Sequence, residues 1–190
     1  RQQILSHRRN SLGKCPDKKI GEIWVQGPNI AKGYWNNPEQ TKETFHAYLA
    51  DTGEGPFLRT GDLGFIKDRE LFITGRLKDL IIIRGKNHYP QDIELTVEQS
   101  YPAFRHGCSA AFSVDVKNEE QLVIIQEIKP DYINKVNTDE AVSSVRTAVA
   151  QNHELDLDAI VFIKPRTIPQ PSSGKIRRRP CKTAFLENKS

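Results

Sequence analysis

The sequence predicts an α+β protein made of two parts. Residues 1–77 are rich in predicted strands, with alternating apolar and polar side chains at residues 20–27 and a hairpin pattern at residues 62–75. From residue 79 onward, strand and helix patterns follow in the order β-α-β-β-α-β, which is typical of helices packed on a small sheet. We therefore expect a β-rich part over residues 1–77 and a small α+β domain over residues 78–190, with a hinge at Lys78.

Three segments define the elements of the first part. Ile20–Gly27 alternates apolar and polar residues, which predicts a strand. Asn37 and Pro38 predict the start of a helix, because Asn suits the N-cap position and Pro suits the first helical position. Asp62–Gly75 is typical of a β-hairpin, with two short strands on either side of a polar turn.

The second part contains two predicted helices among its strands. Leu80–Gly85 is an apolar run that predicts a buried strand, and Pro90 begins a helix with Ile93 and Val97 on one face. Further strands are expected at Ser109–Val114, Leu122–Ile128 and Ala159–Pro165. The second helix, starting near Asp139, is expected to bury a stripe of valines, namely Val142, Val145 and Val149.

The net charge of +4 conceals a strongly basic C-terminal segment. The last 27 residues hold eight lysines and arginines against one acidic residue, Glu187. Such a segment predicts an anionic partner, which could be a nucleic acid or a phosphorylated small molecule. The segment lacks the interleaved aromatic residues and the recognition helix that nucleic-acid binding requires, so we expect no nucleic-acid partner.

Composition excludes several other classes of protein. No apolar run approaches the length of a transmembrane helix, and the polar, basic N-terminus lacks the apolar core of a secretory signal. The three cysteines are far apart and form no CxxC pair: Cys15, Cys108 and Cys181. Their spacing predicts neither a disulfide framework nor a metal site, and it suits a reducing cytoplasm.

Asp62 in the predicted hairpin and Arg76 directly after it are candidates for nucleotide binding. Asp62, in the sequence LRTGDLG, is expected in a glycine-flanked turn, where a carboxylate could accept hydrogen bonds from two neighbouring hydroxyl groups. The alternative is a turn residue that bonds its own backbone. Arg76 could hold a phosphate or a ribose, or it could be a solvated arginine of an edge strand.

The stretch PSSGKIRRR places Lys175 in a flexible loop before an arginine run. It is not a P-loop, because no glycine stands five residues before the Gly-Lys pair and Ile176 follows in place of Ser or Thr. A solvated basic tail is the common alternative. His88 has no partner in a recognisable catalytic or metal-binding pattern, and we expect it to serve the structure or an interface.

Four motifs, taken in order and spacing, resemble the adenylate-forming superfamily, which contains acyl-CoA ligases, nonribosomal-peptide adenylation domains and luciferases. The motifs are GEIWVQGPNIAKGYW, FLRTGDLG, GRLKDLIIIRGKNHYPQDIE and PSSGKIRR. Within the superfamily, RGKNHYPQDIE is most similar to fatty acyl-AMP ligases, whereas CoA ligases more commonly have an apolar residue in place of His88. The resemblance implies activation of a fatty acid with ATP and Mg²⁺, then acyl transfer to the phosphopantetheine thiol of an acyl carrier protein.

The resemblance also implies a role for each candidate residue. Asp62 would hold the ribose hydroxyls of the nucleotide, and Arg76 would lie beside it. Lys78 would be the hinge about which the small domain turns between the two half-reactions. Lys175 would reach the fatty carboxylate and the α-phosphate during adenylation. For the arginine run at 177–179, both contact with the carrier and simple solvation remain open.

The resemblance further implies that the chain is the C-terminal part of a longer enzyme. The superfamily's phosphate loop and acyl pocket have no counterpart in the sequence, which also contains no methionine. Residues 1–77 would then be the β-rich end of the large domain, residues 78–190 the small mobile domain, and the isolated chain inactive. An acyl-CoA ligase or a nonribosomal-peptide adenylation domain is the alternative parent, and a non-catalytic binding module is a third possibility.

Overall fold

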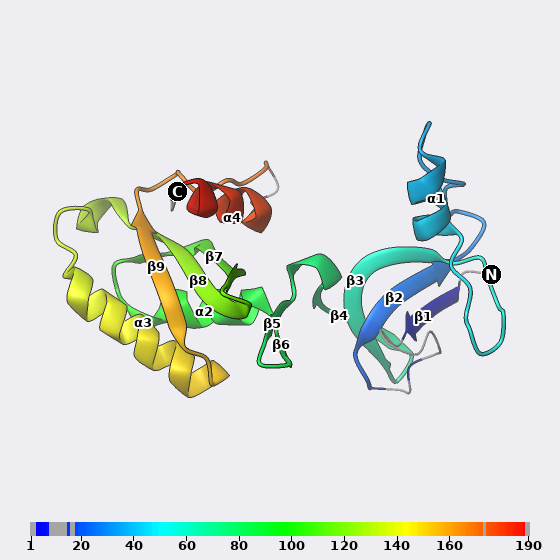
Figure 1. The fold of residues 1–190 in the computed structure, drawn as a ribbon, viewed down its shortest axis with the longest axis horizontal. Coiled ribbons are helices and arrows are strands. Elements are labelled where there is room, and N and C mark those ends of the chain that lie inside the picture. Colours follow the sequence, from blue (N-terminus) through cyan, green and yellow to red (C-terminus); the bar gives the residue numbers. More distant parts are fainter. Residues whose placement is uncertain (1–2, 8–14, 16–17, 173, 189–190) are drawn as a thin grey trace. The chain divides into compact units, whose positions relative to one another are not determined.

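The computed structural model describes residues 3–7, 15, 18–172 and 174–188 (Figure 1). The chain separates into two compact units, residues 1–78 and residues 79–190. The first unit consists mainly of strands and the second combines helices with sheets, so the predicted α+β fold class is confirmed. No helix within the described ranges is long and apolar enough to cross a membrane.

A four-stranded antiparallel sheet forms the centre of the first unit, with its strands in sequential order. The strands are β1 (Gln3–His7), β2 (Gly21–Gln26), β3 (Leu58–Lys67) and β4 (Glu70–Arg76). Strand β2 confirms the strand expected at residues 20–27. The small core of this unit is formed by Trp24, Leu49 and Phe57, with the two aromatic rings 6.2 Å apart.

The two local signals read from the first part are confirmed. Helix α1 (Pro38–Phe45) begins after Asn37, whose side chain accepts the backbone N–H of Gln40 at 3.1 Å and so satisfies a free donor of the first turn. In the β3–β4 hairpin, Asp68 and Arg69 both have positive φ, at 51° and 68°. Two such residues form the type I′ turn, whose twist matches that of the flanking strands.

The main sheet of the second unit has three strands in sequential order. They are β7 (Phe104–Val116), β8 (Glu119–Ile128) and β9 (Leu157–Ile163). Strands β7 and β8 are antiparallel, whereas β8 and β9 are parallel. A parallel pair requires a long crossover connection, and helix α3 (Thr138–His153) lies within it.

Helices cover both faces of this sheet (Figure 1). Successive side chains of a strand point to opposite faces, so neighbouring residues of β8 enter different cores. Leu122 packs in a core with α3 and with α2 (Pro90–Ser100). Val123 packs in a second core with Cys181 of α4 (Arg178–Glu187). The second unit is therefore a three-layer arrangement, and α4 forms its own layer.

Helix α3 begins as expected but buries a slightly different stripe. The side chain of Asn137 accepts the backbone N–H of Glu140 at 3.3 Å and so caps the helix close to its expected start. Val142 is only partly buried, and the stripe runs instead through Ala141, Val145 and Val149, all 0% exposed. These three positions are four residues apart, so they lie on one face of the helix.

The strand expected at residues 80–85 is shorter and less buried than predicted. Strand β5 covers only Ile81–Ile83 and pairs with β6 (Lys86–His88) in a separate two-stranded sheet. Ile82 is 37% exposed, while its two neighbours are buried. The strand ends early because Arg84 and Gly85 turn the chain with positive φ values. The predicted element order therefore lacked β6, and it also lacked α4.

Candidate functional site

Asp62 and Arg76 lie opposite each other in the β3–β4 hairpin. They are register partners, and Nε of Arg76 donates to Oδ1 of Asp62 at 3.1 Å. Their side chains are 39% and 54% exposed, so both charged groups are open to a ligand. An ionised carboxylate has about four acceptor positions, so the bond from Arg76 leaves Asp62 able to accept from further donors.

Asp62 lies within strand β3 rather than in the turn that the glycine-flanked motif predicted. Gly61 has φ of +72°, and the pairing with β4 shifts register between Leu63 and Gly64. The glycines therefore mark a distortion inside a strand, which is a common alternative to a turn. The backbone N–H of Asp62 donates to Oγ1 of Thr60 at 3.0 Å, which fixes the distorted segment.

Lys78 is the last residue of the first unit. It lies in the short 3₁₀ turn Leu77–Asp79, and its side chain is exposed. The division between the two compact units falls directly after it. A residue at this point can absorb a change of backbone angles without disturbing the packing of either unit.

Lys175 lies in the loop that precedes α4, and its side chain is exposed. Two backbone hydrogen bonds close the loop on itself: the N–H of Gly174 donates to the carbonyl of Pro171 at 2.9 Å, and the N–H of Arg177 donates to the carbonyl of Pro169 at 3.0 Å. Gly174 has φ of +73°, which is strained for any other residue. The lysine is therefore presented on a short, closed loop.

The start of this loop is fixed by a buried carboxylate on β8. Oε1 of Glu127 accepts the backbone N–H groups of Thr167 and Ile168, both at 2.8 Å, and Oε2 accepts from Nη1 of Arg105 at 2.6 Å. The Glu127 side chain is 0% exposed. Burial works to raise the pKa of Glu127, but the backbone donors and Arg105 outweigh it and hold this pKa below its usual range.

The three arginines that follow the loop are not equivalent. Arg177 and Arg179 are exposed, as a solvated basic run requires. Arg178 is different, because only 14% of its side chain is exposed and it forms ion pairs with two carboxylates. The interpretation of the whole run as a solvated or docking surface is therefore wrong for Arg178.

His88 belongs to a polar cluster between β6 and the C-terminal end of α3. Its Nε2 atom is buried and has no hydrogen-bond partner among the described residues. Nε2 of His153 lies 2.8 Å from Oγ1 of Thr96. Burial lowers the pKa of both histidines, and for His88 the nearby His153 and Lys86 lower it further. The cluster resembles packing between elements more than a catalytic site.

These two histidines are expected to make the chain less stable in mild acid. Each has a folded-state pKa below its unfolded value of about 6.5, so the unfolded chain binds protons more readily below that pH. We expect the free energy of unfolding to fall between about pH 7.5 and about pH 5.5, and to fall less in a His88→Asn, His153→Gln variant. Urea unfolding measures this, with His46→Gln, an exposed histidine, as control. If the free energy of unfolding fell equally in the natural chain and in the double variant, the assignment to these two histidines would be contradicted.

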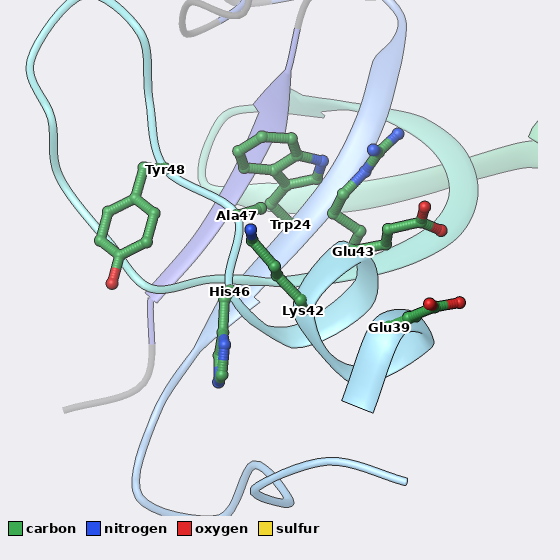
Figure 2. Close-up of a pocket in the computed structure, with 8 residues that line it drawn as sticks. Trp24, Glu39, Lys42, Glu43, His46, Ala47 and Tyr48 are labelled. Carbon is green, nitrogen blue, oxygen red and sulfur yellow. The ribbon is translucent and has the colours of Figure 1, made fainter. Parts of the chain in front are cut away.

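The first unit also has a surface pocket of about 510 Å³ beside α1 (Figure 2). Figure 2 shows Trp24 at its back, with Lys42 and His46 from the α1 region at its edge. Nε1 of Trp24 donates to Glu22 at 3.1 Å, and Arg59 donates to the same carboxylate at 2.8 Å. Since these groups bind one another, they stabilise the unit, and the mixed charges indicate no particular ligand.

Neither a metal centre nor a thiol nucleophile is indicated. In the part of the chain that the structure describes, no group of three or more His, Cys, Asp or Glu residues could hold a metal ion. The cysteines are free and buried. Burial raises the pKa of Cys108, and it raises the pKa of Cys181 to about 11, so both thiols stay protonated and unreactive near neutral pH.

The fold and the order of these motifs are those of adenylate-forming enzymes. A structure solved in a study of fatty acyl-adenylate ligases from E. coli and L. pneumophila matches this chain with a TM-score of 0.78 and 30% sequence identity. The match covers 98% of this chain and 31% of that one. JamA of Moorena producens, a medium-chain-fatty-acid–[acyl-carrier-protein] ligase, is 55% identical over 93% of this chain. A putative fatty-acid–CoA ligase of Mycobacterium leprae is 44% identical over 88% of it.

These similarities confirm the resemblance to the superfamily and to its fatty acyl-AMP ligase branch. Residues 78–190 match the family model described as Disco-interacting protein 2-like, AMP domain, and the chain belongs to that family. The chain spans about 30% of the length of each of these two curated relatives.

Proposed function

We propose that this chain is part of a fatty acyl-AMP ligase, and we call the longer protein that contains it the parent ligase. The parent ligase joins a fatty carboxylate to the α-phosphate of ATP, which releases pyrophosphate and forms an acyl-adenylate. It then transfers the acyl group to the phosphopantetheine thiol of an acyl carrier protein, which releases AMP. The observation that carries this proposal is the 55% identity, over 177 residues, with a medium-chain-fatty-acid–[acyl-carrier-protein] ligase. Residues 1–77 belong to its large domain and residues 78–190 to its small domain.

The β3–β4 hairpin supplies the nucleotide contacts in this proposal. Asp62 accepts hydrogen bonds from the two ribose hydroxyls, for which its exposed carboxylate retains acceptor capacity. Arg76 fixes the orientation of that carboxylate through the 3.1 Å bond and places a positive charge beside the nucleotide. Magnesium that accompanies ATP is held by the phosphate oxygens and one or two carboxylates, and we propose it as part of the bound nucleotide without assigning it a residue.

Lys175 acts in the adenylation step. A fatty carboxylate is a weak nucleophile, and negative charge must be stabilised on the α-phosphate oxygens as the new bond forms. The ammonium group of Lys175, placed beside the fatty carboxylate and the α-phosphate, stabilises that charge more in the transition state than in the ground state. Its place on an exposed loop lets it withdraw afterwards, so that the thiol can reach the acyl-adenylate. Lys78 is the hinge for that movement.

The thiol that accepts the acyl group distinguishes this function from that of an acyl-CoA ligase. The name of the Mycobacterium relative, a putative fatty-acid–CoA ligase, favours the second function. We expect the parent ligase to load holo-carrier protein efficiently and to form little acyl-CoA. The motivation is the segment Asn87–Tyr89 and the identity with the carrier-dependent relative. The measurement supplies preformed acyl-AMP with CoA or holo-carrier at matched thiol concentration. Faster transfer to CoA would replace this proposal with the acyl-CoA ligase.

The cytoplasm is the compartment that we propose for this chemistry. The three cysteines are free thiols, which persist in a reducing environment. The free phosphopantetheine thiol of a carrier protein requires the same reducing environment.

A further inference from the structure

Arg178, the first residue of α4, is the centre of a largely buried ionic cluster. Its Nε and Nη2 atoms donate to the two carboxylate oxygens of Glu94 at 2.7 and 2.6 Å. Its Nη1 atom donates to Oδ2 of Asp79 at 3.0 Å. The side chains of Glu94 and Asp79 are only 8% and 23% exposed. The guanidinium therefore bridges two carboxylates with three directed bonds, two of them in the bidentate geometry that only arginine provides.

The cluster connects segments that are far apart in the sequence. Glu94 lies on α2, and its Oε1 atom also accepts the backbone N–H of Ala111 on β7 at 2.9 Å. Asp79 is the first residue of the second unit and directly follows Lys78. Arg178 thus joins the start of α4 to α2, β7 and the beginning of the unit.

The local sequence gives no reason for an arginine at this position. The N-terminus of a helix carries partial positive charge, so cations are disfavoured there, and the first turn of α4 contains no acidic residue. Burial of the guanidinium is also costly unless it is paired. The position is explained by its partners, Glu94 and Asp79, rather than by the stability of α4.

We propose that Arg178 is a positioning residue for Lys175, holding the end of the catalytic loop against α2 and the hinge-proximal Asp79. This inference rests on the proposed role of Lys175. Lys175 lies three residues before Arg178, a stretch that spans at most about 10 Å, so a displacement of Arg178 reaches the lysine directly. The other end of the loop is held at Ile168 by Glu127. With both ends fixed, the lysine moves with the whole second unit rather than independently of it.

Two measurements test this role. The first is amide hydrogen exchange over residues 169–177 in the chain itself, comparing the natural protein with Arg178→Lys, Glu94→Gln and Asp79→Asn. The second separates the half-reactions in the parent ligase: acid-dependent ATP–pyrophosphate exchange, and thiol transfer from preformed acyl-AMP. Arg179→Lys changes the exposed neighbouring arginine and is the matched control for amide hydrogen exchange and for the adenylation rate.

We expect Arg178→Lys to speed amide exchange in the loop and to lower the rate of adenylation about tenfold, because a lysine cannot make the three directed bonds. Transfer from acyl-AMP should change much less, and Arg179→Lys should match the natural protein in amide hydrogen exchange and in adenylation. Equal losses in the two half-reactions would overturn the proposal in favour of general destabilisation. Unchanged amide hydrogen exchange over residues 169–177 in Arg178→Lys would overturn it as well.

The two hypotheses fail in different ways. If the parent ligase in its natural form showed no acid-dependent ATP–pyrophosphate exchange, the proposed function would be wrong. The amide hydrogen exchange of residues 169–177 would still decide whether Arg178 holds the loop. If the natural protein were active and Arg178→Lys were equally active with an unchanged loop, the function would stand and the positioning role would be wrong. Glu94→Gln and Asp79→Asn show which carboxylate carries the effect.

Discussion

Replacement of Lys175 by alanine is expected to slow the adenylation half-reaction of the parent ligase by about 10²–10³-fold, or about 2.7–4 kcal/mol of transition-state stabilisation. The ammonium group is exposed on a closed loop, so its removal leaves no buried group without a partner. The loss should therefore come from the developing charge on the α-phosphate and not from unfolding. Acid-dependent ATP–pyrophosphate exchange measures it directly.

The second half-reaction provides the contrast that identifies the role. Transfer from preformed acyl-AMP should be nearly unchanged in Lys175→Ala, because the lysine has withdrawn by then. Lys164→Ala, a change at another exposed lysine of the second unit, should leave both half-reactions unaffected. A comparable loss in both half-reactions would instead assign Lys175 a structural role.

Elements with strong local signals could be predicted from the sequence. Asn37 and Asn137 cap helices that begin where the sequence indicates, because a cap depends only on residues within one turn. The β3–β4 hairpin is confirmed for the same reason. The resemblance to the superfamily is also confirmed, since it depended on four motifs in order and not on any single one.

Interactions between distant segments could not be predicted in this way. Arg178 was one of three adjacent arginines in the sequence, and nothing local distinguishes it from its exposed neighbours. Its partners lie 84 and 99 residues away along the chain. Helix α4 was missed because its apolar residues are sparse and its basic residues suggested a solvated tail. Asp62 was misplaced in a turn because a glycine with positive φ can distort a strand as well as end it.

Glu127 was also missed as a structural residue, although the sequence contained a signal. It stands in the run LVIIQEI, where the other side chains are mostly apolar, and an acidic residue in a buried strand must have partners. The sequence could indicate that such a partner exists. Only the fold identifies it as the backbone of Thr167 and Ile168, at the start of the Lys175 loop.

Replacement of Glu127 by alanine is expected to lower the free energy of unfolding of the second unit by about 3–6 kcal/mol, because two hydrogen bonds to a charged group, each contributing about 1.5–3 kcal/mol, are lost. The two backbone N–H groups at 2.8 Å would lose their acceptor, while Arg105, whose side chain is 39% exposed, could turn to solvent. Urea unfolding measures the change. Glu119→Ala, on the same strand but exposed, is the control and should change stability by less than about 0.5 kcal/mol.

The pH dependence separates the charge of Glu127 from its packing. Its pKa in the folded chain lies below the unfolded value of about 4.3, so its contribution is fully present above that value and is lost as the pH falls through the folded pKa. The difference in unfolding free energy between the natural chain and Glu127→Ala should therefore be largest near neutral pH and shrink in acid. A difference that stayed constant down to about pH 3 would assign the loss to packing alone and contradict the carboxylate's role in fixing the loop.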